Sequence, residues 1–389
     1  MKVVHVCVTG IWGEEYAYQE NLLPHYHRLS GNEVTIIAAT YSKYSDGKPK
    51  ESPVGTSYLK DGCKLMRLAP AISNYSINGH LHLVKGLKKA IIHERPDLLF
   101  VHDVSCFNFA CLPYIKRRFP MMRVVFDNHS DLVNSLHSPI TKFLHKIIYR
   151  YFLVPKLIPI AEIFYGVTPS RCEFLNTIYH IPKGNIKLLV MGADDEKMNL
   201  DQRSSIRKEV RTKYGFSDSD FVIVSGGKID LLKNFHNLAN AVNQLKITTM
   251  KLLLFGSILP NAKEKIESEL SDRVQYIGWI QSDKVYDLFY AADLIVFSGL
   301  HSVLWEQAVA SGTPCAFSKI SGFDHVLFDN NCILMEDNTS EYYQQMLNRL
   351  SFDSKLYQSL KEHCSSTKVE QFYYSRIAKQ VFIDAGLEN

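Results

Sequence analysis

The segment LIVFSGLHSVLWEQAVASGTPCAF, residues 294–317, has the pattern of a strand, a helix and a second strand. Its first four residues are apolar and β-prone, which predicts a buried strand. A helix is expected to begin near Ser302, and Gly312 is placed to end it, because glycine readily adopts the left-handed conformation found after a helix. Pro314 prevents its continuation, and residues 314–317 predict the next strand. Such a unit is typical of a parallel sheet flanked by helices.

The same alternation of short apolar runs and longer helical stretches extends over the whole chain. One series of predicted strands comprises residues 3–8, 34–38, 64–68, 98–101, 123–126, 165–168 and 186–190. A second series comprises residues 221–225, 251–255, 274–277, 294–297, 314–317 and 332–334. The stretch after residue 190, to about residue 220, is expected to be a hinge and an entry helix. We therefore predict an α/β protein with two Rossmann-like, doubly wound parallel sheets facing each other across a cleft, in domains 1–190 and 191–370.

The composition and charge of this 389-residue chain limit the classes of partner that it is expected to bind. It is 46% hydrophobic and 22% charged, as expected of a chain with sizeable cores. Residues 1–190 carry a formal charge of +9 and 11 of the 15 histidines, whereas residues 191–389 carry −5. The basic half favours an anionic partner, such as a membrane surface or an acidic substrate. The small total of +4 argues against a dedicated nucleic-acid binder, so no nucleic acid is expected as a partner.

The cysteines and the amino terminus indicate a cytoplasmic protein. The eight cysteines include no CxxC pair, and residues 1–8 have the pattern of a strand rather than of a signal peptide. The most membrane-like segment, residues 140–167, is interrupted by charged residues and prolines and is not expected to span a bilayer. Within it, Lys142, Lys146 and Arg150 are four residues apart. They fit either a peripheral contact with anionic lipid on the inner face of the plasma membrane or an ordinary solvated helix face.

Glu306 is the most informative polar residue of the second half. It lies between Trp305 and Ala308 in an otherwise apolar stretch, and a buried carboxylate without a partner is costly. A polar ligand that donates hydrogen bonds, such as a ribose, is therefore expected there. Free backbone N–H groups where the helix begins, near His301 and Ser302, would favour an anion such as a diphosphate.

A second candidate phosphate site is the segment SGGKIDLLKN, residues 225–234, which follows another predicted strand. Gly227 would let a phosphate approach the backbone closely, and Lys228 and Lys233 would supply positive charge. A tight turn with two solvated lysines is the alternative interpretation.

Residues 298–314 resemble the signature segment of glycosyltransferase family four, which comprises retaining enzymes of the GT-B fold. In that signature two glutamates, separated by seven residues, precede an alanine-rich helix that ends in Gly-Thr-Pro. Glu306 matches the second, ribose-binding glutamate, whereas Ser298 stands where the family has the first. A serine there can still hydrogen-bond a donor sugar, but it carries no charge.

The resemblance extends over nearly the whole chain. It implies that Lys228 and Lys233 hold the diphosphate of a sugar donor, and that Gly256 and Ile280 lie in donor-binding loops, the second contacting the base through its backbone. It also implies that the C-terminal helix, residues 371–389, packs back on the first domain.

Candidate residues of the first half follow the predicted strands 98–101 and 123–126. His102 and Asp103 come after the first strand and His129 after the second. A histidine at such a position can donate a hydrogen bond to a sugar hydroxyl or carry a proton. The resemblance matches His129 to the family's histidine that approaches the donor sugar. A loop histidine satisfied by a neighbouring carboxylate is the alternative.

The loop after the first predicted strand is the expected acceptor side. It lacks the glycine pair that the family has before its first helix, which predicts a different loop shape. Its candidate residues are Gly13, Gln19 and Glu20.

The resemblance implies a retaining glycosyltransferase of the hexosyltransferase type. It would move a sugar from a UDP- or GDP-sugar to a glycan or lipid-linked glycan, as in the synthesis of bacterial capsule, O-antigen or other surface polysaccharides. Neither a cofactor nor a metal is expected for the chemistry. Ser298 and the missing glycine pair leave open a nucleotide-sugar-binding protein without turnover, and a GT-B epimerase is a further alternative.

Overall fold

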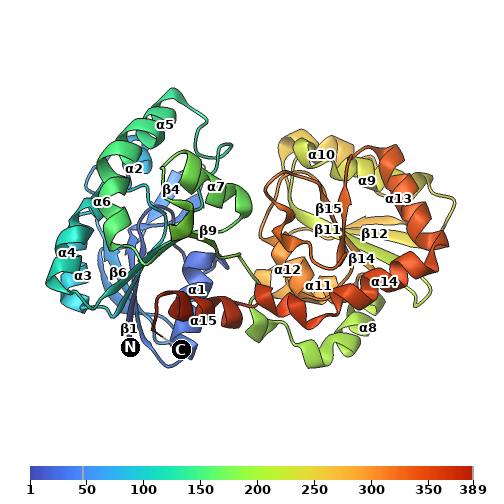
Figure 1. Cartoon of the computed structure of the whole chain (residues 1–389). Coiled ribbons are helices and arrows are strands. Elements are labelled where there is room, and N and C mark those ends of the chain that lie inside the picture. The colour runs from blue at the N-terminus through green and yellow to red at the C-terminus, as the bar shows by residue number, and fades with distance from the viewer. Residues whose placement is uncertain (46–47, 388–389) are drawn as a thin grey trace. The chain divides into compact units, whose positions relative to one another are not determined.

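The computed structural model describes residues 1–45 and 48–387, which form two compact units (Figure 1). The first unit contains residues 1–191, and the chain returns to it at Tyr374. The second unit contains residues 192–373. Within the described ranges, no helix is both long and apolar enough to cross a membrane.

The first unit is built on an eight-stranded sheet in the order β10-β9-β8-β7-β1-β2-β6-β5. Its neighbouring strands are parallel except for the antiparallel pair β5 and β6. The strands are β1 (Lys2–Cys7), β2 (Glu33–Ala39), β5 (Gly55–Tyr58), β6 (Lys64–Leu68), β7 (Leu98–Val101), β8 (Arg123–Phe126), β9 (Ile163–Gly166) and β10 (Ile186–Leu188). The order reverses between β1 and β7, which makes this pair the switch point where open α/β sheets bind ligands.

Helices cover both faces of the first sheet. Alternate residues of β1 enter two separate cores, Val4 and Val6 one of them and Val3 and Cys7 the other, as strand geometry requires. The second core is closed by α1 (Gln19–Leu29) and α15 (Tyr374–Asp384), which lie side by side (Figure 1). The other helices are α2 (Tyr75–Leu81), α3 (Leu87–Glu94), α4 (Leu112–Arg118), α5 (Pro139–Phe143), α6 (Val154–Leu157) and α7 (Pro169–Thr177).

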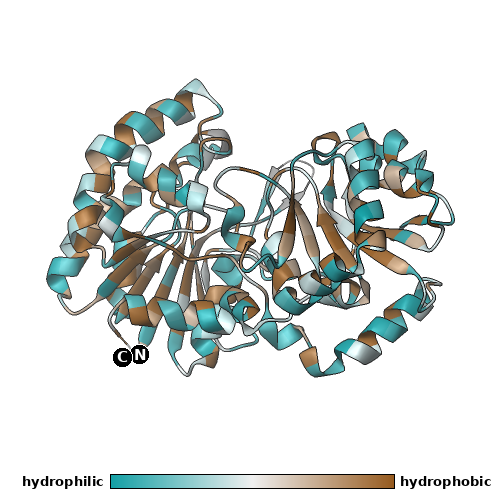
Figure 2. Cartoon of the chain, turned by 45° about the vertical axis from the view of Figure 1, so that its right-hand side comes forward, coloured by the Kyte–Doolittle hydropathy of each residue, from teal (hydrophilic) through white to brown (hydrophobic). Residues whose placement is uncertain are grey.

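The second unit has a six-stranded, all-parallel sheet in the order β13-β12-β11-β14-β15-β16. The strands are β11 (Phe221–Ile229), β12 (Met250–Ile258), β13 (Val274–Tyr276), β14 (Leu294–Phe297), β15 (Cys315–Ser318) and β16 (Cys332–Met335). The helices are α8 (Arg203–Lys213), α9 (Phe235–Gln244), α10 (Pro260–Glu267), α11 (Val285–Ala291), α12 (Leu304–Ala310), α13 (Ser340–Phe352) and α14 (Ser354–Cys364). Figure 2 shows apolar residues along the strands of both sheets. The predicted class, an α/β chain with two doubly wound parallel sheets, is confirmed.

Several element boundaries differ from the prediction. Strand β9 ends at Gly166, because Thr168 caps α7 by accepting a hydrogen bond from the Arg171 N–H and Pro169 begins that helix. Helix α12 begins at Leu304 rather than near Ser302. Strand β11 continues to Ile229, so the supposed glycine turn is part of a strand.

Three short strands were not predicted, because their sequences lack a hydrophobic pattern typical of a strand. Strands β3 (Tyr41–Ser45) and β4 (Lys48–Glu51) form a separate antiparallel ribbon, and β5 is exposed along its whole length. Because β5 buries no face, it shows no alternation of apolar and polar residues.

The basic segment of the first unit forms one continuous helical stretch. Between α5 and α6, residues Leu144–Leu153 are wound as a π-helix. Buried residues recur at every fourth position, at Thr141, His145, Tyr149 and Leu153. Residues four apart therefore lie on one side, so the series that begins at Lys142 lies beside this buried row.

Candidate functional site

Glu306 lies on α12, directly after β14 at the switch point of the second sheet. Its side chain is 0% exposed. Oε1 accepts hydrogen bonds from Nε2 of His301 and Nε2 of His325, each at 2.8 Å. Oε2 is buried and has no hydrogen-bond partner among the described residues. Burial raises the pKa of Glu306, but His301 and His325 outweigh it and lower the pKa to about 2. Glu306 is thus a carboxylate at neutral pH with one unpaired oxygen, which is an unusual state for a buried group.

His325 is the member of this group that sequence reasoning missed. It lies in the short turn Asp324–Val326 after β15, and its side chain is 1% exposed. No motif or spacing marks it, because only the fold brings it to Glu306. The side chain of His301 holds Glu306, and the diphosphate contact expected of the backbone N–H groups near His301 and Ser302 stays a prediction. Ser302 lies before the helix, where its carbonyl accepts from the Trp305 N–H at 2.9 Å.

Gly227 of β11 and Gly256 of β12 allow the backbones of these two strands to pack closely. Gly227 lies opposite Gly256 in the parallel register of the two strands. A Cβ on Gly256 would lie 1.9 Å from the Gly227 carbonyl oxygen, and one on Gly227 would lie 2.9 Å from Leu304. Close packing of the two backbones and of α12 accounts for glycine at these positions, and the phosphate contact of Gly227 stays a prediction.

The two candidate lysines lie at the end of β11 and in the turn that follows it. Lys228 is exposed and Lys233 half-buried. Burial, together with the nearby charge of Lys228, lowers the pKa of Lys233, and Asp230 opposes this. The Ser298 hydroxyl donates a hydrogen bond to the Lys233 carbonyl. This hydrogen bond joins the residue after β14 to the turn that contains Lys233. Ser298, Lys233 and Lys228 therefore all lie near the C-terminal ends of β11 and β14.

The loop that contains Ile280 adjoins the same edge. The Gly256 N–H donates to the Gly278 carbonyl at 2.8 Å, and the Tyr276 hydroxyl donates to the Gly256 carbonyl at 2.6 Å. Ile280 follows two residues later and is half-buried. The structure thus gathers most of the predicted donor-side residues where the strands of the second sheet end.

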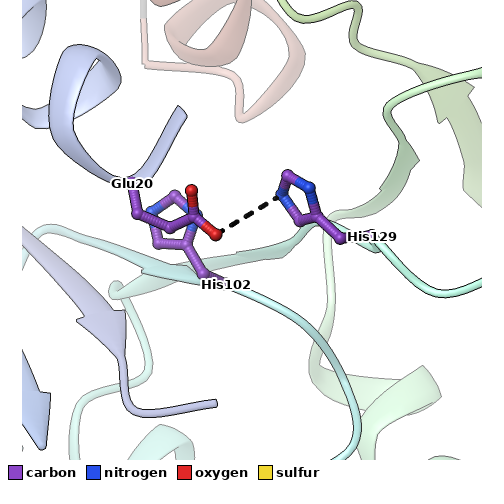
Figure 3. Close-up of side chains that lie close together, drawn as sticks. All are labelled: Glu20, His102 and His129. Atoms are coloured by element: carbon purple, nitrogen blue, oxygen red, sulfur yellow. Dashed lines mark ion pairs between the residues drawn. The ribbon is translucent and has the colours of Figure 1, made fainter. Parts of the chain in front are cut away.

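In the first unit, an acidic and histidine-rich group occupies the ends of β7 and β8. Nε2 of His129 lies 3.3 Å from Asp127 Oδ2. The same nitrogen lies 3.9 Å from Glu20 Oε1 (Figure 3). Nδ1 of His102 lies 2.8 Å from the same Asp127 oxygen. Burial lowers the pKa of His129, but Asp127 and Glu20 outweigh it and raise the pKa to about 9. Asp127, which sequence reasoning did not single out, is the shared partner of both histidines.

Two hollows of the first unit adjoin this group. A hollow of about 420 Å³ is lined by Glu20, and one of about 260 Å³ is lined by Asp103 and His129. Gly79 and His82 line both. His129 and Glu20 therefore face space that a ligand could occupy. Glu20 lies at the N-terminal end of α1, which follows β1, and His129 lies in the loop after β8.

Three other predicted residues of the first unit are engaged by the protein itself. His102 is 1% exposed and hydrogen-bonded at both ring nitrogens, which does not favour direct contact with a substrate. The Asp103 carboxylate accepts from the N–H groups of Val104 and Ser105 at 2.6 and 3.0 Å. Gln19 is buried, with its amide nitrogen 3.4 Å from Asp127 Oδ2.

Gly13 has a structural reason of its own. A Cβ at this position would lie 2.4 Å from the carbonyl oxygen of Ser42. The close approach of the loop to β3 requires glycine. This packing explains why glycine occurs at position 13 without a contact to an acceptor sugar.

Among the residues that the structure describes, two groups place three possible metal-ligating atoms within 4.8 Å of one another. They are Glu20, His102 and His129 in the first unit, and His301, Glu306 and His325 in the second. In each group the histidine nitrogens already lie at hydrogen-bonding or ion-pairing distance from a carboxylate. We therefore interpret both groups as hydrogen-bonded networks.

Comparison with known proteins places these residues in context. Residues 206–365 match the family model described as glycosyl transferases group 1. Mannosylfructose-phosphate synthase of Agrobacterium fabrum (strain C58 / ATCC 33970) is 25% identical over 191 residues, which is 43% of this chain and 41% of that protein. The chain thus matches less than half the length of this curated relative.

Solved structures resemble the chain over nearly its whole length. Anabaena HepE in complex with UDP superposes with a TM-score of 0.68 and 14% identity, covering 99% of this chain and 100% of that chain. Sucrose-phosphate synthase from Thermosynechococcus elongatus gives a TM-score of 0.67 and 16% identity, covering 98% and 97%. At these identities the likeness concerns the fold. The chain therefore has the GT-B architecture of two Rossmann-like units, and its second unit carries a group 1 glycosyl transferase region at residues 206–365.

Proposed function

We propose that the chain is a retaining, nucleotide-sugar-dependent glycosyltransferase whose second unit binds a UDP- or GDP-sugar. The observation that carries the proposal is the unpaired, buried Oε2 of the ionised Glu306, within the matched family region. A buried carboxylate oxygen without a donor is costly, so a ligand hydroxyl that supplies the hydrogen bond stabilises the bound state. The resemblance implies that this hydroxyl belongs to a ribose. The name of one structural neighbour, Anabaena HepE in complex with UDP, supports the nucleotide class.

The chemistry of donor cleavage concentrates negative charge on the departing diphosphate. In our proposal Lys228 and Lys233 stabilise this charge. Lys228 lies near the C-terminal end of β11 and Lys233 in the turn that follows, and β11 is paired with β14, the strand that precedes the helix of Glu306. The half-buried Lys233 contributes more per charge, because a less hydrated ammonium interacts more strongly with an anion. His301 and His325 fix Oε1 and thereby hold the carboxylate plane, which leaves Oε2 for the ligand.

The first unit is proposed to bind the acceptor, a glycan or lipid-linked glycan of a surface polysaccharide. Its hollows lie at the switch point of its sheet and are lined by His129, Asp103 and Glu20. Asp127 holds His129 as a cation at neutral pH, so His129 can donate a hydrogen bond to an oxygen of a sugar. No metal or cofactor takes part in the proposed chemistry.

Two experiments test this proposal. Calorimetric titration with UDP and with GDP is expected to show saturable binding of at least one, and the absence of binding to any nucleoside diphosphate would contradict it. Mass spectrometry of products from a panel of nucleotide sugars, with NMR of the recovered donor to detect an epimer of equal mass, then identifies the reaction. Transfer to an acceptor supports the proposal. Donor turnover at the same background rate in wild type and in Glu306→Ala supports a binding protein without turnover, and a stereoisomer of the intact donor supports an epimerase.

The first unit is also proposed to contact an anionic membrane surface. Large apolar side chains are exposed along residues 132–152, at Leu132, Val133, Ile140, Phe143, Ile147, Tyr151 and Phe152. Lys142 and Lys146 lie among them and are exposed, and Arg150 is half-exposed. Apolar side chains beside basic ones suit the boundary between acyl chains and anionic headgroups, where each basic residue contributes about 1 kcal/mol.

The proposed membrane contact is tested by sedimentation with vesicles. The triple variant Lys142→Gln, Lys146→Gln and Arg150→Gln should bind vesicles of phosphatidylcholine and phosphatidylglycerol less than wild type does, and bind nucleotide unchanged. A charge-matched control replaces three lysines of the second unit, Lys263, Lys319 and Lys361, by glutamine. Equal vesicle binding by the two triple variants would contradict this surface.

A further inference from the structure

A continuous chain of hydrogen-bonded rings crosses the first unit from Asp127 to α15. Nδ1 of His102 lies 2.8 Å from Asp127 Oδ2, and Nε2 of His102 lies 3.1 Å from Nδ1 of His5. Nε2 of His5 lies 3.0 Å from Nδ1 of His27, and Nε2 of His27 lies 3.2 Å from the Ala378 carbonyl oxygen. The three rings are at most 1% exposed. They come from β1, from α1 and from the residue after β7, so only the fold aligns them.

The protons of this chain can be counted. A hydrogen bond needs one proton between its two heavy atoms, and four contacts join Asp127, His102, His5, His27 and Ala378. Both ends of the chain are acceptors, a carboxylate and a carbonyl oxygen. Three neutral imidazoles carry three ring protons, one each. Whichever way the rings are oriented, one contact is then left with two facing lone pairs, so four satisfied contacts require a fourth proton.

We propose that His102, His5 and His27 hold this extra proton beside Asp127, with His102 as an imidazolium, and that the chain positions Asp127 as the charged partner of His129. The donor and acceptor directions follow from this assignment. His102 donates from Nδ1 to Asp127 and from Nε2 to His5, His5 donates from Nε2 to His27, and His27 donates from Nε2 to Ala378. His102 is then a positioning residue, which accounts for its burial.

The surroundings fit this distribution of charge. Asp127 accepts hydrogen bonds from the Asp103 N–H at 2.8 Å, from Gln19 at 3.4 Å and from both histidines, which favours its ionised form. Burial opposes ionisation, but His102 and His129 together hold the pKa of Asp127 well below its usual range. The extra proton is therefore on the ring and not on the carboxylate.

The other two rings of the chain, His5 and His27, and the neighbouring Cys7 thiol stay neutral. Burial holds the pKa of His5 well below its usual value and lowers that of His27 to about 3. Burial, with Glu20 and Asp127 nearby, raises the pKa of the Cys7 thiol well above its usual range. Arg171 is the other charged group that acts on His129, and it lowers the pKa of that ring. The two carboxylates, Asp127 and Glu20, thus face two imidazolium ions.

Nitrogen NMR of the histidine-labelled full chain tests the proposal, because the chemical shifts of Nδ1 and Nε2 distinguish an imidazolium from each neutral tautomer. The expected spectrum at pH 7 shows His102 protonated at both nitrogens, and His5 and His27 as neutral rings protonated at Nε2. A spectrum in which all three rings are neutral would overturn the proposal. This measurement needs no substrate and is independent of the proposed transferase activity.

A pair of variants at His27 separates the proton count from mere packing. In His27→Phe the phenyl ring would fit beside the ring of Phe382, whose centroid is 4.5 Å from that of His27. Because phenylalanine forms no such hydrogen bond, the chain of hydrogen-bonded rings then stops at His5. Two rings then serve two contacts, so His102 should become neutral and His5 should move its proton to Nδ1. In His27→Gln the amide accepts from His5 and donates to Ala378, so His102 should stay an imidazolium.

The same pair reports on the positioning of Asp127. With a neutral His102 beside it, Asp127 keeps more of its charge for His129, so the pKa of His129 should rise in His27→Phe and stay near the wild-type value in His27→Gln. Equal His102 spectra in both variants would overturn the proposal. If His27→Phe does not fold, the wild-type and His27→Gln spectra still decide the protonation of His102.

Discussion

Replacement of Glu306 by glutamine tests the centre of the proposed donor site. The substitution keeps the shape of the side chain and removes its charge. Oε1 already accepts from His301 and His325, so one oxygen, Oε2, remains for a ligand. A hydrogen bond to a charged group contributes about 1.5 to 3 kcal/mol. Because about 1.4 kcal/mol is a factor of ten, UDP or GDP should bind roughly 10- to 100-fold more weakly to the variant.

Stability measurements show whether the variant also loses the folding contribution of the carboxylate. The pKa of Glu306 is lowered to about 2 in the folded chain, so its stabilising effect is present above the pKa of the unfolded state and disappears as pH falls toward 2. The shift corresponds to about 3 kcal/mol at neutral pH. Acid unfolding of Glu306→Gln should therefore begin from a lower stability and depend less on pH below about 4.

The assay is calorimetric titration with nucleotide, with denaturant unfolding of the same preparations. Glu336→Gln is the matched control, because Glu336 is exposed and paired with Lys319 at 2.7 Å, a contact of small energetic value. The control should bind nucleotide as wild type does. Nucleotide binding by folded Glu306→Gln within twofold of wild type would contradict a ligand contact at Oε2.

Three further predictions concern packing and charge. Gly256→Ala should unfold the second unit, since its Cβ would lie 1.9 Å from a backbone oxygen, whereas Gly278→Ala meets no atom within 4 Å and should cost only about 1 to 2 kcal/mol; denaturant midpoints that do not separate the two would contradict this. The pKa of His129 is raised to about 9, so the stabilising pair with Asp127 is fully present below the unfolded pKa of about 6.5 and is lost as pH rises through 9. The free energy of unfolding should therefore fall more between pH 6 and pH 10 in wild type than in His129→Gln. Ser298→Glu, which introduces the glutamate that the resembling signature has at this position, should destabilise the fold by more than about 2 kcal/mol, because the side chain is 2% exposed and faces a carbonyl oxygen; an unchanged thermal midpoint would show room for the carboxylate.

Sequence reasoning predicted the strands best where they are apolar on both faces. Buried parallel strands such as β7 and β14 are short continuous apolar runs, so their positions followed from composition alone. The exposed strand β5 has no such run and escaped prediction. The boundaries of β9 and α12 depended on a cap and on turn geometry, which a hydrophobic pattern does not contain.

The sequence by itself determined the α/β class and the two series of buried strands, and it marked Glu306 as a carboxylate within an apolar helix, because burial along a strand and a lone carboxylate in an apolar helix are local properties. The tertiary structure alone decided which side chains meet. It brought His325 to Glu306, paired Gly227 with Gly256, and aligned His5 and His27 with His102. These contacts join elements far apart in the chain, and their existence depends on strand order and register, which the spacing of residues along the sequence does not specify.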